Sequence, residues 1–377
     1  MKVVVAMDSY KGCMTAIEAC QAISCGINAT FPQSKQVLLP MSDGGDGMLD
    51  AFVTATSCDI EPIEVSGPIP GTKVTAKIGY INNGKTAIIE SAQACGLSLI
   101  EEGKRNPTIT TSYGVGEMIT HAVDKGCKKI IIGLGGSGTN DFGIGMLGAL
   151  GITFLDSSNS KLEPIVGNID KICHIAGINK VSELFSTIQD LIASDVVSPL
   201  YGPLGATYTF GPQKGATALQ VKELEIAAHT FSNIVSQEIG ADFSDYPGAG
   251  AAGGIGYALK SFIDCTFMSG AELMMQLTDF ENQIKDANLI ITGEGKSDKQ
   301  TLLGKIPGKI VECATRHNVK CALLSGAIDD EELLRNSGFS EIIPVTKPGT
   351  PLDIAMRKDI AAANISKAVK AITQISL

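Results

Sequence analysis

Residues 128–151, KKIIIGLGGSGTNDFGIGMLGALG, have the composition of an anion-binding turn. The β-branched run 130–132 predicts a buried strand, and residues 145–150 predict a short helix. Five glycines in residues 133–143 would let a phosphate approach the backbone, and the helix start would offer unpaired N–H groups. The stretch therefore predicts an anion site, although a tight turn that only packs a helix against a sheet fits the same residues.

The same turn also fits a second kind of site. Gly133, Gly135 and Gly138 match G-x-G-x-x-G, and Asp156 ends the strand-like sequence ITFLD. A glycine-rich turn followed by an acid about 20 residues later is the outline of a dinucleotide-binding unit. A nicotinamide-dependent oxidoreductase is therefore the rival hypothesis. Against it, the intervening helix is very short, and the first strand–loop–helix unit of the chain lies elsewhere.

Acidic residues in the glycine-rich loops could bind Mg²⁺, which prefers hard oxygen ligands. Asp141 lies in the turn described above, and Asp43 and Asp46 flank two glycines in SDGGDG. Asp43 and Asp46 could bind a metal ion or a substrate hydroxyl. The alternative is that they cap and begin a helix, and this alternative is strong for Asp46.

Three further acids follow predicted strands. Asp195 comes after LIAS and could accept the proton of a substrate hydroxyl, or it could simply form a turn. Glu294 and Asp298 lie among glycines in GEGKSD, where they could bind Mg²⁺ or substrate. Asp298 could instead cap the following helix.

Four basic residues are candidates for binding phosphate or carboxylate. Lys11 follows the first predicted strand, Lys305 follows Gly304, and Lys214 lies in GPQKG. Arg105, before Asn-Pro, could bind a carboxylate with two parallel hydrogen bonds. Each could equally be an ordinary surface residue or part of a surface ion pair.

Composition narrows the class of protein. The 377 residues carry a net charge of −10 and contain no Lys/Arg-rich run, so no nucleic-acid or membrane partner is expected. The N-terminal apolar run is too short for a signal peptide, and the ten cysteines form no Cys-x-x-Cys pair, which favours a cytoplasmic protein with free thiols. There is no G-x-x-x-x-G-K-[ST] motif, so a P-loop is excluded.

The order of predicted elements indicates an α/β protein with two domains. Strand–polar loop–helix units occur near the N-terminus and return from about residue 287, whereas the middle contains a β-hairpin at residues 73–90. We expect one doubly wound parallel sheet built from residues 1–67 and 287–377, with an inserted mixed α/β domain at residues 68–286. The polar loops follow the carboxyl ends of strands, so we expect the site in the cleft between the domains.

Eight blocks of this sequence also match, in order, those of a known family. The blocks are DSYKG, SDGGDG, RNP with TSYGVGE, GLGGSGTNDFGIG, ASDVVSPLYG, FGPQKGA, PGAGAAGG and ITGEGKSDKQTLLGK. They span essentially the whole chain, which resembles the bacterial type I glycerate kinases. The departures include Phe142, where the family more often has glycine, and Ser198, where it has asparagine.

The resemblance implies a flavodoxin-like domain with an inserted α/β domain, and a kinase that transfers the γ-phosphate of ATP to D-glycerate. The expected product is 2-phosphoglycerate, the expected cofactor is Mg²⁺, and the oligomeric state is open, with a homodimer as one option. A non-catalytic metabolite-binding regulator is the third hypothesis. The assigned residues are catalytic Asp195, Lys11 and Asp298; substrate-binding Arg105, Ser9, Asp43 and Lys305; nucleotide-binding Gly135, Gly136, Ser137, Thr139, Asn140 and Lys214; and metal-binding Asp43, Asp46, Asp141 and Glu294.

Overall fold

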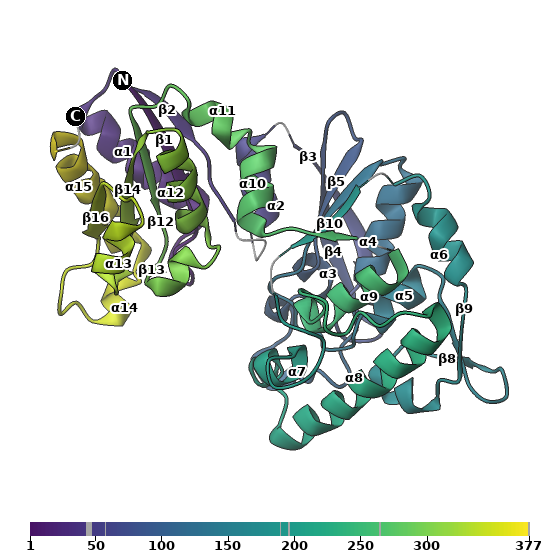
Figure 1. Cartoon of the computed structure of the whole chain (residues 1–377). Coiled ribbons are helices and arrows are strands. Elements are labelled where there is room, and N and C mark those ends of the chain that lie inside the picture. Colours follow the sequence, from purple (N-terminus) through teal and green to yellow (C-terminus); the bar gives the residue numbers. More distant parts are fainter. Residues whose placement is uncertain (43–46, 57, 189, 195–196, 264, 376–377) are drawn as a thin grey trace. The chain divides into compact units, whose positions relative to one another are not determined.

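The structure is a computed structural model that describes residues 1–42, 47–56, 58–188, 190–194, 197–263 and 265–375 (Figure 1). The chain forms two compact units. Unit 1 comprises Met1–Asp43, Asp50–Ser57 and Ser269–Leu377, and unit 2 comprises Gly44–Leu49 and Cys58–Met268.

Unit 1 is built on a five-stranded parallel sheet that joins the two ends of the chain. Its strand order is β16 (Glu341–Pro344), β14 (Lys320–Ser325), β12 (Leu289–Gly293), β1 (Lys2–Met7) and β2 (Lys35–Leu38). β1 and β12 are neighbours, with Val3 opposite Leu289. Numbered within the unit, the order is 2-1-3-4-5, which is the flavodoxin-like arrangement. The prediction that both chain ends share one parallel sheet is confirmed.

Helices cover both faces of this sheet (Figure 1). α1 (Ala16–Thr30) and α15 (Lys358–Ile375) pack together, and their apolar residues form one core with alternate residues of β1, β12 and β14. α12 (Ile306–Arg316) packs against the same strands from the other side. α1 starts with a capping box, in which the Thr15 hydroxyl accepts from the Glu18 N–H and the Glu18 carboxylate accepts from the Thr15 N–H. The other elements of the unit are α2 (Met48–Ala55) from Asp50 onward, α10 (Gly270–Leu277), α11 (Phe280–Ile284), β13 (Lys296–Ser297), η6 (Lys299–Leu302), β15 (Ala327–Ile328), α13 (Glu331–Asn336) and α14 (Leu352–Ala355).

The close approach of β12 and β14 requires glycine at residue 293. A Cβ atom at Gly293 would lie 1.7 Å from the carbonyl oxygen of Leu324, which is backbone and cannot rotate away. We therefore expect Gly293→Ala to lower the free energy of unfolding by at least about 2 kcal/mol, as overpacked cores do. Urea unfolding measures this loss. Gly103→Ala is the control, since a Cβ there has nothing within 4 Å, and equal midpoints for the two variants would contradict the expectation.

Unit 2 is built on a six-stranded mixed sheet. The order is β11 (Thr266–Phe267), β10 (Asp190–Ser194), β6 (Lys129–Gly133), β5 (Thr86–Glu90), β4 (Lys73–Ile81) and β3 (Asp59–Ser66). The first four strands run parallel, and β3, β4 and β5 form an antiparallel meander. The predicted hairpin of β4 and β5 is present, and Asn82 and Asn83 both have positive φ at its turn.

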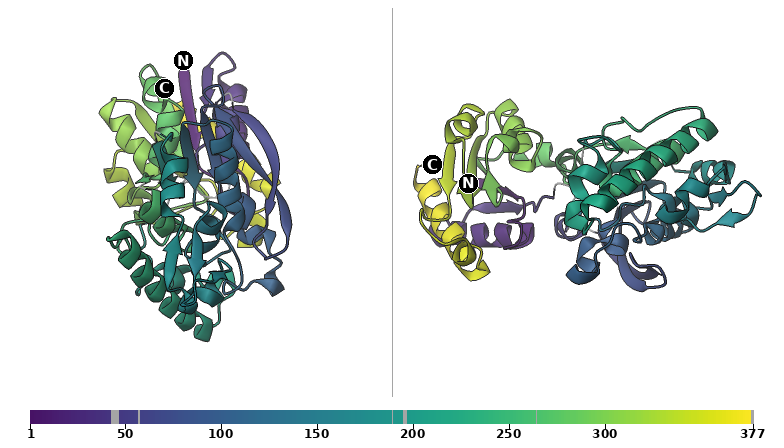
Figure 2. Two further views of the ribbon diagram at one scale, coloured as in Figure 1. Left: turned by 90° about the vertical axis from the view of Figure 1, so that its right-hand side faces the viewer. Right: turned by 90° about the horizontal axis from the view of Figure 1, so that it is seen from below.

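Helices and a small second sheet complete unit 2. The longest helix, α8 (Ala218–Ile239), runs along the edge of this unit (Figure 2). A three-stranded antiparallel sheet is formed by β8 (Lys161–Leu162), β7 (Thr153–Leu155) and β9 (His174–Ala176). The remaining elements are α3 (Ala92–Cys95), η1 (Leu97–Leu99), η2 (Glu102–Lys104), α4 (Tyr113–Asp124), α5 (Ile144–Ala149), η3 (Val166–Lys171), α6 (Ile178–Phe185), α7 (Ala206–Phe210), η4 (Pro212–Lys214), η5 (Ala251–Gly253) and α9 (Ile255–Ile263).

The unit boundaries differ from the predicted domain boundaries at residues 67 and 287. β3 pairs with β4 along all of its residues, from Asp59 to Ser66, so it belongs to unit 2. α10 and α11 belong to unit 1, where α10 packs against α12. Within the described ranges, no helix has both the length and the apolar character needed to cross a membrane. All ten cysteines are unpaired in the structure.

Candidate active site

Polar loops of unit 1 meet where β1, β12 and β14 end, because the strands are parallel and neighbouring. Ser9 follows β1 through the buried Asp8, whose Oδ1 accepts from the Ser9 N–H at 2.6 Å. Glu294 follows β12 directly. A Cβ atom placed on Gly295 would lie 3.6 Å from the Lys11 backbone nitrogen, so these two loops are in contact.

Glu294 is the centre of a buried polar network. Its Oε1 accepts from the Thr301 hydroxyl at 2.7 Å and from the Ser297 hydroxyl at 3.1 Å. The Ser297 hydroxyl also lies 2.7 Å from that of Ser325, at the end of β14. Lys305 places its ammonium 3.4 Å from Glu294 Oε2, so two residues that were assigned separately lie side by side. Sequence reasoning did not assign Thr301 or Ser325; the Ser-Gly that ends β14 was the available signal.

Asp298 has the geometry of a helix cap. Its Oδ1 accepts from the Gln300 N–H at 2.8 Å, and its own N–H donates to the Thr301 hydroxyl at 3.1 Å. These bonds begin η6, which is the capping alternative stated above. Lys11 is exposed at the loop that follows β1. The catalytic roles of Asp298 and Lys11 stay predictions.

The glycine-rich turn of unit 2 is mostly buried. Ser137, Thr139 and Asn140 are inaccessible or nearly so, whereas Gly135 is half-buried and Gly136 exposed. Asn140 Nδ2 donates to the Thr207 hydroxyl at 3.0 Å, and its Oδ1 has no partner among the described residues. The accessible backbone of this turn is therefore at Gly135 and Gly136.

Lys214 supports this turn from inside the unit. It is 3 % exposed, and its ammonium donates to the Ser137 hydroxyl at 3.0 Å and to the Thr139 carbonyl at 2.6 Å. Burial lowers the pKa of Lys214 to about 8. The predicted surface alternative is wrong for this lysine. Its charge lies against the predicted anion turn.

Arg105 lies beside the Lys214 segment. Gly215 has a φ of +93°, and a Cβ atom there would lie 2.4 Å from the Arg105 carbonyl oxygen, so the two backbones touch. Arg105 Nε is buried and has no hydrogen-bond partner among the described residues. Unit 2 therefore brings Lys214 against the turn at residues 135–140, and Arg105 against the segment that carries Lys214.

Asp141 points into the interior of unit 2 and does not face solvent, as a metal ligand here would need to. It is completely buried, and its oxygens accept from the N–H groups of Gly143 and Gly145 and from both the N–H and the hydroxyl of Ser112. Burial raises the pKa of Asp141, and these four donors oppose that shift. The prediction that Asp141 faces a metal is not supported by this geometry.

The start of α5 is also not free to bind an anion. The Gly145 N–H donates to Asp141 Oδ2 and the Met146 N–H donates to the Ser112 hydroxyl at 2.9 Å, so side chains satisfy the amides that a phosphate would need. The expectation that this helix start binds a phosphate is wrong, because Asp141 and Ser112 already cap it.

The Phe142 side chain packs in the hydrophobic core and does not fill the space of the glycine-rich turn. Its side chain is completely buried, its φ is +56°, and its N–H donates to the Gly253 carbonyl at 2.9 Å. A Cβ atom on Gly253 would lie 2.2 Å from the Thr139 carbonyl oxygen. The second glycine-rich segment, residues 247–254, therefore packs directly against the first.

The dinucleotide-binding alternative does not match the topology. β7, which precedes Asp156, pairs antiparallel with β8 and β9 instead of joining the parallel strands beside β6. Asp156 Oδ1 accepts from Ser158 and Ser160 in the turn between β7 and β8. A ribose-binding acid would end the strand next to β6, so this hypothesis is wrong.

Three assigned residues, Asp43, Asp46 and Asp195, lie outside the described residues, and their roles stay predictions. In the described part, unit 1 offers Ser9, Lys11, Glu294 and Lys305, and unit 2 offers the turn with Lys214 and Arg105. Within unit 2 a buried ammonium lies behind accessible glycine backbone, and within unit 1 a buried carboxylate lies beside an ammonium. Charged groups of these kinds suit the transfer of a charged group, which depends on positioning and neutralisation.

Comparison with known proteins agrees with this chemistry. The model of the glycerate kinase family matches residues 3–377. The chain is 39% identical to a glycerate kinase of Bacillus cereus, over 100% of this chain and 98% of the relative. It is 38% identical to a glycerate 2-kinase of Escherichia coli K12, over 95% and 93% of the two chains.

A solved structure gives the same result. A crystal structure from Salmonella typhimurium LT2, assigned to glycerate kinase 2, superposes with a TM-score of 0.86 at 35% identity, covering 99% of this chain and 97% of that one. Fold and sequence together define an α/β kinase. The chain belongs to the glycerate kinase family.

Proposed function

We propose that this protein transfers the γ-phosphate of ATP to the 2-hydroxyl of D-glycerate, giving 2-phosphoglycerate and ADP. The observation that carries the proposal is the full-length match to glycerate kinases, one of which is named a glycerate 2-kinase. The charged groups around the two sets of loops support it, since both substrates are anions and the chain has a net charge of −10.

In this proposal the turn at residues 135–140 binds the nucleotide phosphates. Gly135 and Gly136 offer accessible backbone, and Lys214 supplies positive charge from behind through its bonds to Ser137 and Thr139. Burying a lysine costs desolvation free energy, which a neutral side chain in the same space would not. A buried lysine is therefore typical of a functional group.

The network around Glu294 fits Mg²⁺ in its donor chemistry. Its members are a carboxylate and the hydroxyls of Ser297, Thr301 and Ser325, which are the hard oxygen ligands that Mg²⁺ prefers. Bound with ATP, Mg²⁺ would neutralise phosphate charge. Lys305, beside Glu294, would neutralise the transferred group or bind the glycerate carboxylate.

The remaining roles follow the assigned residues. Arg105, whose Nε–H has no partner among the described residues, would bind the glycerate carboxylate. Ser9 and Asp43 would bind glycerate hydroxyls. Asp195 would accept the proton of the 2-hydroxyl. The location of the reaction in a cleft between the two domains stays a prediction, as does the cytoplasmic location.

A coupled assay of ADP release tests the proposal. Purified protein with ATP and Mg²⁺ should release ADP only when D-glycerate is added, and 3-hydroxypropionate, which lacks the proposed acceptor 2-hydroxyl, serves as the control that should release none. Release without glycerate would contradict the proposal. Tight glycerate binding without turnover would favour the metabolite-binding regulator instead.

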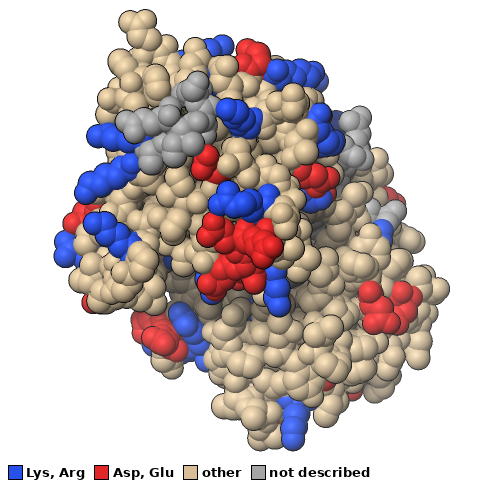
Figure 3. Space-filling view, turned by 60° about the vertical axis from the view of Figure 1, so that its left-hand side comes forward, with Lys and Arg blue, Asp and Glu red and all other residues tan. Residues whose placement is uncertain are grey.

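On the face shown in Figure 3, Lys and Arg side chains are dispersed among Asp and Glu side chains. Together with the negative net charge, this distribution agrees with a small-molecule enzyme.

A further inference from the structure

A second cluster of polar side chains lies in unit 1, away from the loops described above. It contains Glu281 of α11, Cys313 near the end of α12 and His317 just after α12. One carboxylate oxygen, the thiol sulfur and one imidazole nitrogen all lie within 4.8 Å of one another. Three different metal-binding groups thus converge on one point.

Helix geometry fixes two of the three groups. His317 caps α12, and its N–H donates to the Cys313 carbonyl at 3.2 Å, so the two side chains are one turn apart on the same face. Cys313 Sγ lies 3.8 Å from Glu281 Oε1, on the neighbouring helix. A ligand bound here would join α11 to α12.

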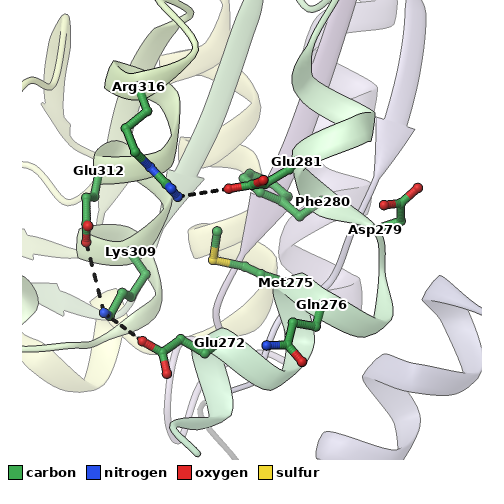
Figure 4. Close-up of a pocket in the computed structure, with 9 residues that line it drawn as sticks. All are labelled: Glu272, Met275, Gln276, Asp279, Phe280, Glu281, Lys309, Glu312 and Arg316. Carbon is green, nitrogen blue, oxygen red and sulfur yellow. Dashed lines mark hydrogen bonds and ion pairs between the residues drawn. The ribbon is translucent and has the colours of Figure 1, made fainter.

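One member of the cluster, Glu281, lines a cavity of about 440 Å³ between α10, α11 and α12. Glu281 and Arg316 point toward one another at its wall and form an ion pair of 2.9 Å (Figure 4). The lining carries four carboxylates and two basic groups, so its charge favours a cation. The residues that line it are Glu272, Met275, Gln276, Asp279, Phe280, Glu281, Lys309, Glu312 and Arg316.

The position of the cluster separates it from the candidate active site. Cys313 and His317 lie where α12 leads into the start of β14 at Lys320. Glu294 and Ser325 follow the opposite, carboxyl ends of the strands of the same parallel sheet. The two groups of residues therefore lie at opposite ends of the strands of that sheet.

We propose that Glu281, Cys313 and His317 bind one borderline divalent cation of the Zn²⁺ or Co²⁺ class, with water from the cavity as the fourth ligand. Thiolate, imidazole and carboxylate are the ligands that zinc uses, and three protein ligands with an open position are common. Tetrahedral zinc, with bonds of about 2.0–2.3 Å, places its ligand atoms about 3.3–3.8 Å apart, so closure by about 1 Å completes the site. Arg316 must release Glu281, which its exposed side chain permits.

Binding should release a proton. The Cys313 thiol gives up its proton to solvent as its sulfur bonds to the cation. Burial raises the pKa of Cys313; Arg316 on the same helix opposes this shift, and Glu281 on α11 adds to it. His317 and, from β14, Cys321 are the other titratable groups that face it.

Titration of chelator-treated, full-length protein with Co²⁺ tests the proposal. One equivalent should produce thiolate-to-cobalt charge-transfer absorption, Zn²⁺ should abolish it, and Mg²⁺ should not, because Mg²⁺ avoids sulfur. Cys313→Ser should remove the absorption, and His317→Ala and Glu281→Gln should weaken affinity by about tenfold or more. Circular dichroism establishes that each variant is folded.

Cys173→Ser is the matched control, since Cys173 is an exposed thiol outside the cluster and should bind Co²⁺ like the wild type. The proposal is overturned if Cys313→Ser keeps the absorption, if Cys173→Ser loses it, or if the folded wild-type protein gives none. Glu281→Gln changes an exposed side chain, so its result does not depend on preserving a buried residue.

Discussion

Replacing Lys214 with methionine should lower kcat/KM for ATP by about a hundredfold or more, with a much smaller effect on the melting temperature. The ammonium is the positive charge behind the turn at residues 135–140, and methionine retains its length but not its charge. Burial already opposes the charged form, as the lowered pKa shows, so removing the ammonium relieves a desolvation cost. This gain offsets the loss of its hydrogen bonds to Ser137 and Thr139. Kinetics beside a melting curve measures both effects.

Lys222→Met is the control for this variant, because Lys222 is an exposed lysine on α8 and should tolerate the change in both measurements. A Lys214→Met protein that melts lower but keeps full activity would show that the lysine only holds the turn together.

The same lysine predicts a pH dependence with a definite sign. Its pKa in the folded protein, about 8, lies below the ordinary value of 10.5. Between these values the unfolded chain binds more protons, so the contribution of this group to stability rises as pH rises through this range. Its charge, however, is lost above about pH 8, and kcat/KM for ATP should fall there in the wild type. Lys214→Met should lack this fall.

Replacing Glu294 with glutamine should lower kcat by about a hundredfold or more. The amide keeps the shape of the carboxylate but loses its charge, and its NH₂ group would face either the hydroxyls of Ser297 and Thr301 or the Lys305 ammonium, which are all donors. Stability should also fall, by about 1–3 kcal/mol, because a buried donor is left unpaired. Both kcat and urea unfolding should be measured.

Glu331→Gln provides the comparison for Glu294→Gln, since Glu331 forms an exposed ion pair with Arg335 that contributes little. A destabilised Glu294→Gln enzyme with an unchanged kcat would assign Glu294 to the structure alone and would remove it from the proposed metal ligands.

The sequence predicted the parallel sheet and the hairpin because their patterns are local. The runs of β1 and β12 are predominantly apolar, and two asparagines and a glycine form the turn after β4. It did not predict β3, in which Pro62 breaks the expected strand pattern. The structure tolerates this proline because β3 is the edge strand of its sheet.

The sequence predicted which loops form the candidate site, but not which side chains contact one another there. Glycine spacing located the turn after β6, yet nothing in the spacing shows that Asp141 and Ser112 occupy the amides of α5. Likewise, the sequence around Lys214 does not show whether this lysine lies at the surface or is buried. Its burial depends on contacts with Ser137 and Thr139, which lie more than 70 residues away in the chain.

The position of the new phosphate ester tests the central claim most directly. Phosphorus NMR of a reaction with D-glycerate, ATP and Mg²⁺ should show ADP and one phosphomonoester whose phosphorus couples to a single proton, that of C2. Coupling to the two protons of C3 would identify 3-phosphoglycerate and contradict the proposed regiochemistry. Formation of inorganic phosphate with no ester would contradict phosphoryl transfer to glycerate altogether.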